Sequence, residues 1–175
     1  MTLGRVADDA GIVVGSLRHI FSSRDDLLQG MAEQLAIRAE ASSHERDAVF
    51  RRFDIAPKEL AWTLPHSRER RMRWRVEQAL LVESRQHPGF SDAVARCREA
   101  RRRDCEKVVQ TLARPFGVPQ NEQDFEAKRT LALFEGLSYQ IGAAVTGNVD
   151  KAEARRMLED SLAGLSDRWR LRRRR

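Results

Sequence analysis

The sequence is poor in the residues that mark several classes of protein. Its 175 residues include two cysteines, one tyrosine and five prolines, and almost no stretch alternates apolar with polar residues, which argues against β-strands. No apolar run approaches the ~18 residues that cross a bilayer, and residues 1–20 lack the features of a secretory signal. We therefore expect an all-α protein that has no membrane span and stays in the cytoplasm.

Side chains that perform catalysis or hold metals are also scarce. Cys97 and Cys105 fall in one predicted helix, where their Cα atoms would lie ~12 Å apart, beyond the reach of a disulfide. Neither the cysteines nor His66 and His87 have the spacing of metal ligands. Because the chain also lacks a phosphate-binding glycine loop and a nucleophile elbow, we expect no enzyme activity, no metal and no cofactor.

The chain is basic. It has 32 Lys and Arg against 26 Asp and Glu, a formal net charge of +6 and a pI near 10.1, which favours an anionic partner such as nucleic acid. Residues 168–175 contain six arginines, as many charges as the whole excess. We expect this Arg-rich tail to be a disordered, solvated end that adds a salt-sensitive attraction to polyanions.

The apolar periodicity predicts two short helices followed by long ones. The first covers residues 2–10 and is closed by Gly11, and the second contains Leu17 and ends near Phe21. Ser22 and Ser23, each followed three positions later by an aspartate, predict the start of a long third helix. Two short helices joined by a glycine turn are typical of a helix-turn-helix unit.

Longer helices follow. They are predicted between Pro57 and Pro65, over residues 67–87 and 91–116, and, after a loop at 119–124, over residues 125–146 and 150–169. In the 67–87 helix the predicted core positions are Met72, Val76, Ala79 and Leu80. We expect three parts: a DNA-binding region over residues 1–44, an effector-binding and dimerisation domain over residues 45–167, and the tail.

The first region carries a resemblance. Residues 2–28, TLGRVADDAGIVVGSLRHIFSSRDDLL, resemble the DNA-binding segment of TetR-family transcriptional regulators. The resemblance implies a recognition helix that starts at Gly15 and keeps Leu17 and Phe21 in the core. We expect the following DNA-binding residues: Thr2, Arg5, Val14, Gly15, Ser16, Arg18, His19 and Arg24.

Physical reasoning supports these assignments. A helix enters the major groove only if its leading end approaches the bases closely, and Gly15 and Ser16 are small enough to allow this. Arg18 reaches a phosphate or a guanine edge, His19 donates to phosphate, and side chains near helix starts hold the flanking backbone. The expected partner is double-stranded DNA with a palindromic operator.

The chain departs from the family pattern in three ways. Val13 stands where the family has a capping Ser or Thr, at a cost of ~1 kcal/mol, and Ile20 stands where it has an aromatic residue or His. Family members also have a further helix before Thr2. Without it, we expect the apolar faces of Leu3, Val6, Ile12 and Leu17 to be incompletely covered, which implies either a start codon assigned too late or impaired DNA binding.

Residues 132–143, ALFEGLSYQIGA, and residues 150–158, DKAEARRML, are similar to the last two helices of the BetI-type subgroup of the family. The resemblance implies that this part binds a small effector and dimerises. A four-helix interface between two copies is expected to use Leu133, Leu137, Ile141, Leu158, Leu162 and Leu165. The alternative is that these residues form the core of the single chain.

An effector pocket between the helices is expected to contain Trp62, Trp74, Glu77, Leu81, Phe90, Phe134 and Tyr139, although ordinary core packing also accounts for these aromatic residues. Glu77 indicates either a cationic ligand or an ion pair with Arg73 at helical spacing.

The leading interpretation is a dimeric, ligand-responsive transcriptional regulator, a repressor. One alternative is a helical dimer that binds small molecules or proteins and whose truncated DNA-binding region is inactive. Another is a non-specific nucleic-acid binder that depends on the Arg-rich tail.

Overall fold

The computed structural model describes residues 3–11, 13–85, 87, 89–143 and 149–173, and these contain helices and no strand. The elements, in chain order, are α1 (Leu3–Ala10), α2 (Val14–Ile20), α3 (Arg24–Glu45), α4 (Asp47–Phe50), α5 (Ala56–Trp62), α6 (Arg68–Glu83), α7 (Gly89–Ala113), the 3-10 turn η1 (Arg114–Phe116), α8 (Gln120–Gly142) and α9 (Lys151–Arg173). The prediction of an all-α fold is confirmed.

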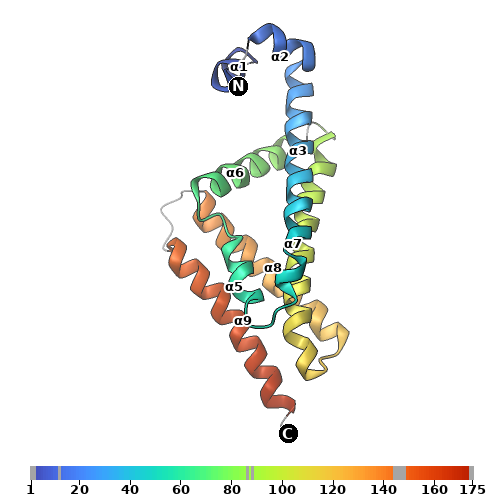
Figure 1. Ribbon diagram of the computed structural model, residues 1–175, viewed down its shortest axis with the longest axis vertical. Helices are drawn as coiled ribbons and strands as arrows, with labels where there is room; N and C mark the ends of the chain where they lie inside the picture. Colours follow the sequence, from blue (N-terminus) through green and yellow to red (C-terminus); the bar gives the residue numbers. More distant parts are fainter. Residues whose placement is uncertain (1–2, 12, 86, 88, 144–148, 174–175) are drawn as a thin grey trace.

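The helices α1 and α2 form a small head at one end of the long helix α3 (Figure 1). α3 has 22 residues and is therefore about 33 Å long at ~1.5 Å per residue. It runs alongside α7, while α6 crosses towards the pair from the far side of the body (Figure 1). α9 leads to the opposite end of the molecule, so the head and the end of the described chain lie far apart (Figure 1).

Several helix ends follow the sequence signals. Gly11 adopts the left-handed φ of 67° that ends α1. The Ser23 hydroxyl accepts a hydrogen bond of 3.0 Å from the backbone N–H of Asp26 at the start of α3, and the Asp150 carboxylate accepts from the N–H groups of Ala152 and Glu153, both at 2.8 Å, at the start of α9. These two predicted starts are confirmed. Val13 precedes α2 without a side-chain hydrogen bond, as its sequence position predicted.

The body contains two apolar clusters. The larger lies among α4, α5, α7, α8 and α9 and includes Phe50, Leu60, Val108 and Leu112. The smaller joins α3 to α6 and α7 through Ala32, Ala36, Leu80, Phe90 and Val94. The second cluster matters for function because it attaches the helix that carries the head to the rest of the body.

Two predictions about the C-terminal half are wrong. Residues 119–124 are not a loop, because α8 already begins at Gln120. The tail is not a disordered end over its described part, because α9 continues to Arg173. Trp169 continues the apolar stripe of α9, is 3% exposed and donates a hydrogen bond of 2.8 Å to Glu122.

The residues predicted for the dimer interface pack mainly inside the single chain. The core contains Leu137, Ile141, Leu158, Leu162 and Leu165, each no more than 8% exposed. A side chain so deeply buried has almost no surface left to offer a second copy, so the assignment of these five residues to an interface is corrected. Leu133 is half-buried and keeps some surface.

The predicted core face of α6 is also corrected. Met72 is 55% exposed and Ala79 is exposed, whereas Glu77 is buried together with Leu80. The reason is that only part of the inner side of α6 meets an apolar layer, through Val76 and Leu80. The rest, including Glu77, borders a cavity that contains charged side chains. No described helix is long and apolar enough to cross a membrane, and the described residues hold no cluster of side chains that could bind a metal.

Candidate functional site

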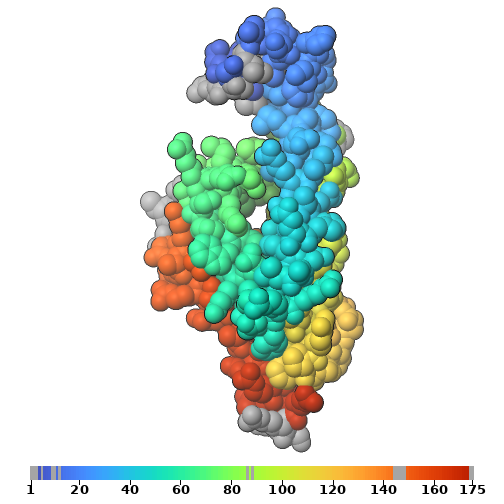
Figure 2. Space-filling view, viewed as in Figure 1, coloured from blue at the N-terminus to red at the C-terminus, as the bar shows by residue number. Residues whose placement is uncertain are grey.

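A cavity of about 200 Å³ lies between α3, α6, α7 and α8. Figure 2 shows an opening beside α3, where α6 approaches it. α3 supplies Leu35, Arg38 and Ser42 to the cavity wall, so the helix that carries the head also forms one side of the cavity. The wall contains, in full, Leu35, Arg38, Ala39, Ser42, Arg46, Thr63, Pro65, Arg70, Arg73, Trp74, Glu77, Cys97, Ala100, Arg101, Asp104, Phe134 and Ser138.

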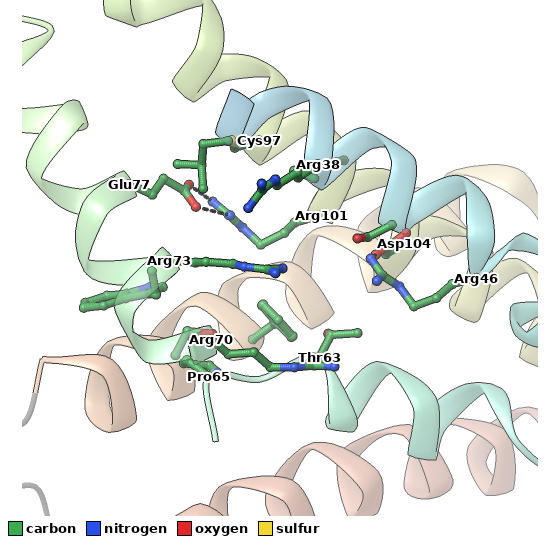
Figure 3. A pocket seen from close by; sticks show the side chains of 17 residues that line it. Arg38, Arg46, Thr63, Pro65, Arg70, Arg73, Glu77, Cys97, Arg101 and Asp104 are labelled. Atoms are coloured by element: carbon green, nitrogen blue, oxygen red, sulfur yellow. Dashed lines mark hydrogen bonds and ion pairs between the residues drawn. The ribbon is translucent and has the colours of Figure 1, made fainter. Parts of the chain in front are cut away.

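Glu77 forms a bidentate ion pair with Arg101 of α7, with distances of 2.6 and 2.8 Å between nitrogen and oxygen atoms (Figure 3). Burial lowers the pKa of Arg101, but the hydrogen bonds and charge of Glu77 outweigh it and the net pKa is raised. Arg73, the partner expected from helical spacing, pairs instead with Glu69 at 2.5 Å. The charge of Glu77 is therefore neutralised within the protein, and the structure gives no support to the expected attraction of a cationic ligand.

The second acid of the wall is neutralised as well. Asp104 is 3% exposed, pairs with Arg46 at 2.5 Å and accepts a hydrogen bond of 2.5 Å from Ser43. Ser43 lies in α3 and Asp104 in α7, so these hydrogen bonds and ion pairs also attach the C-terminal end of α3 to α7.

The other charged residues of the cavity wall are arginines. Arg38, Arg70 and Arg73 line the same cavity (Figure 3). Among the described residues Arg38 has no ion-pair partner within 4.0 Å, and Arg70 donates only to the backbone carbonyl of Trp62, at 2.5 Å. Burial, followed by repulsion from Arg46, lowers the pKa of Arg70. The cavity therefore presents an excess of positive charge.

The other lining groups are apolar or weakly polar. Trp74 and Phe134 contribute aromatic surface. Ser138 is 3% exposed, and its hydroxyl has no hydrogen-bond partner in the described part of the chain. Burial, and then the charge of Glu77, raise the pKa of the Cys97 thiol to about 12, so Cys97 contributes as a neutral side chain. Cys97 and Cys105 are both free and buried.

The structure brings together part of the predicted effector pocket. Trp74, Glu77 and Phe134 line the cavity, and Leu81 and Tyr139 line an adjacent one of about 230 Å³ that shares Trp74, Glu77, Arg101 and Ser138 with it.

Two predicted pocket residues lie elsewhere. Trp62 is 45% exposed, and the guanidinium of Arg155 lies 3.8 Å from the centre of its ring, outside both cavities. Phe90 is buried in the smaller apolar cluster, where it packs between helices. Neither residue can therefore be assigned to the effector pocket.

Sequence reasoning missed the arginines of the wall. Arg70 and Arg73 stand among several other arginines in the 67–87 segment, and a charge run of this kind usually marks a solvated helix face. The available signal was weak: Arg70, Arg73, Trp74 and Glu77 recur at spacings of three and four, which places them on one side of a helix.

The head exposes most of the side chains predicted to bind DNA. Gly15, Ser16, Arg18, His19 and Arg24 are exposed and Val14 is half-buried. The outer surface of the head thus keeps its polar and cationic groups free.

Some predictions for the head lie outside what the structure describes. Thr2 and Ile12 are outside the described residues, as are the side chains of Leu3 and Arg5. Leu17 is 5% exposed, so the expectation that its apolar face is left uncovered is wrong. Val13 and Ile20 are the large apolar residues that the described head leaves open, at 74% and 68%.

The comparison with family models agrees with this architecture. The model described as BetI-type transcriptional repressor, C-terminal, matches residues 58–167, well over half of the chain. No curated protein and no solved structure gives a significant match. The matched segment includes α6, α7, α8 and most of α9. It therefore contains every lining residue of the cavity except those of α3 and Arg46. The chain accordingly belongs to the TetR family of transcriptional regulators, with a C-terminal part of the BetI type.

Proposed function

We propose that this TetR-type regulator is a ligand-responsive repressor that binds a palindromic operator as a homodimer. The head contacts DNA, and the cavity binds a small effector. One observation carries the proposal: Arg38 and Leu35 of α3 line the cavity, while the same helix continues to the head (Figure 1). A ligand that favours one position of α3 therefore also favours one position of the head.

DNA binding is assigned to the leading end of α2. Gly15 and Ser16 are exposed there, and an added Cβ at Gly15 would meet no atom within 4 Å, so the helix end is slim and unobstructed. Arg18 and His19 are exposed beside it. In this arrangement phosphate contacts set the position of the head and base contacts select the sequence.

The test is a titration of an upstream promoter fragment by fluorescence anisotropy. Gly15→Trp is expected to abolish specific binding because the indole keeps the helix out of the groove, and Arg18→Gln is expected to weaken it. Arg170→Gln removes the same charge near the far end of α9 and serves as the control. If Arg170→Gln weakens binding as much as Arg18→Gln does, non-specific attraction by the tail explains the binding better than the head does.

Dimerisation is assigned to the surface where α8 and α9 meet. A groove of about 170 Å³ lies there, lined by Glu126, Arg129, Thr130, Leu133, Ser161 and Leu165. Leu133 keeps surface at this groove, and a second copy placed there would form a bundle of four helices. Two heads spaced ~34 Å apart would then match successive major grooves.

Sedimentation velocity tests the interface. Leu133→Arg is expected to shift the protein towards the monomer, whereas Ile37→Arg, at a site 42% exposed on α3, is expected to leave the dimer intact. A Leu133→Arg protein that remains fully dimeric at low micromolar concentration would remove this surface from the proposal.

A further inference from the structure

We propose that the cavity is specific for a compact organic anion and that the anion bridges α3 and α6 through Arg38, Arg70 and Arg73. This inference rests on the proposed effector function, which it deepens by naming the chemical class of the effector and the helices that it joins.

The first argument is charge. The wall contains five arginines and two acids, and both acids are already held by arginine: Glu77 by Arg101 and Asp104 by Arg46. Three other guanidinium groups face the same space (Figure 3). Arg73 pairs with Glu69, which lies outside the cavity wall, whereas Arg38 and Arg70 have no carboxylate partner within 4.0 Å among the described residues. A guanidinium binds a carboxylate or phosphate through parallel N–H···O bonds, and these charge-assisted bonds are among the strongest in proteins.

The second argument is the state of Arg70. Its pKa is lowered by burial and then by repulsion from Arg46, which means that the charged form is held in an unfavourable environment. An anion in the cavity would offset both effects. A cation would add to the repulsion, so the site discriminates against the class of ligand that Glu77 alone had indicated.

The third argument is an unsatisfied polar group. Ser138 is 3% exposed, and within the described residues its hydroxyl lacks a hydrogen-bond partner. It lines both the cavity and its neighbour. Since a buried hydroxyl is normally paired, this group is positioned to donate to an oxygen of a bound ligand.

Size and shape restrict the ligand further. The cavity of about 200 Å³ is smaller than the ~300 to 1,000 Å³ of sites for drug-sized molecules. Trp74 and Phe134 supply aromatic surface on its wall. A small body with one apolar side and one anionic group fits these walls better than a bare inorganic anion.

The bridging role follows from where the arginines originate. Arg38 belongs to α3, whereas Arg70 and Arg73 belong to α6. An anion bound to both sides draws the two helices together, and α3 carries the head. Arg38 and Arg70 repel each other across the cavity, and an anion bound between α3 and α6 would replace this repulsion by attraction. The charge of the ligand would therefore favour one position of α3 over another.

The experiment is isothermal titration calorimetry of the full chain with three isosteric probes: benzoate, benzamide and benzamidine, which are anionic, neutral and cationic. Benzoate is expected to bind at least about tenfold more tightly than either of the others, a difference of ~1.4 kcal/mol. Inorganic phosphate is expected to bind more weakly than benzoate, because it leaves the aromatic wall without a partner.

Three variants locate the binding. Arg38→Gln is expected to weaken benzoate binding about tenfold, since a hydrogen bond to a charged group is typically worth 1.5 to 3 kcal/mol. Arg38→Glu is expected to abolish benzoate binding and to create affinity for benzamidine. Arg68→Gln removes a charge from the exposed side of α6, outside the cavity, and is expected to change nothing. Arg38 is exposed, so these changes leave the fold intact.

The outcomes separate this inference from the proposed function. Equal or tighter binding of benzamide or benzamidine overturns the anion proposal, and so does the absence of binding by every probe. If a neutral or cationic molecule nevertheless releases the operator, the protein is still ligand-responsive and only the anion proposal fails. If benzoate binds through Arg38 but leaves operator affinity unchanged, the anion site stands and its regulatory role is overturned.

Discussion

The contact between Gly142 and Trp74 is a sensitive point in the wall of the cavity. An ideal Cβ at Gly142 would lie 2.4 Å from Cε3 of Trp74 and 2.6 Å from Cδ2, well inside van der Waals contact. Trp74 lines both cavities. A Gly142→Ala substitution must therefore displace the indole ring, and both cavities that the ring lines would change shape.

The size of the effect can be estimated from two opposing contributions. Overpacking of this kind costs about 1 to 3 kcal/mol. Replacing glycine by alanine in a helix gains at most about 1 kcal/mol, and less at Gly142, which is the last residue of α8. We therefore expect Gly142→Ala to lower the free energy of unfolding by up to about 3 kcal/mol and to weaken benzoate binding.

A double-mutant cycle with Trp74→Ala tests this reasoning by urea denaturation followed by circular dichroism. Once the indole is gone, Gly142→Ala has nothing to displace, and the same substitution is expected to be neutral or stabilising. Sites that do not interact usually add within about 0.5 kcal/mol. If Gly142→Ala costs the same in both backgrounds to that precision, the clash with Trp74 is not its cause and the argument is refuted.

Three other predictions concern the head, α3 and the core. A Cβ at Gly30 would lie 2.8 Å from Cε1 of Phe21, so Gly30→Ala should disturb the packing of the head against α3. The substitution should weaken operator binding in an anisotropy titration and leave the benzoate affinity unchanged. The hydrogen bond from Arg96, opposed by a smaller effect of burial, lowers the pKa of Glu40 from its ordinary value of 4.5; the stabilisation is thus complete above pH 4.5 and is lost as the pH falls through the folded-state pKa. Glu40→Gln should accordingly flatten the fall in melting temperature below that pH, and an unchanged acid limb would contradict the assignment. Leu162 is 1% exposed in the larger apolar cluster, so Leu162→Ala should lower the free energy of unfolding by about 2 to 5 kcal/mol in denaturant unfolding. A decrease below about 1 kcal/mol would mean that neighbouring side chains fill the space left by the leucine.

The helix ends show how far local signals reach. Ser23 and Asp150 were predicted to begin helices, and each accepts backbone hydrogen bonds from residues two or three positions later. Such contacts depend on neighbours within one helical turn, so the sequence contains all the information that they need. The start of α8 was misplaced because residues 119–124 are polar, and polarity by itself does not distinguish a loop from the exposed first turns of a helix.

The interior of the body shows where such signals end. An apolar stripe was taken to mark the core of α6, yet Met72 is 55% exposed and Glu77 is 7% exposed. Periodicity identifies the faces of a helix but does not say whether a face meets an apolar layer, a cavity or a partner. The same limit applies to Leu158 and Leu162, whose spacing suits a dimer interface and a monomer core equally.

By itself, the amino-acid sequence determined the all-α class, the helix-turn-helix head with its slim leading end, and the family, because these depend on spacing and on interactions within one or two turns. Only the tertiary structure decided that Glu77 is neutralised by Arg101, 24 positions away, and that Arg38 and Arg70 face one cavity. It also decided that the C-terminal end of α9 lies at the end of the molecule opposite the head (Figure 1). The physical reason is that charge and burial are properties of a place in space, and each such place here is built from helices that are distant in the chain.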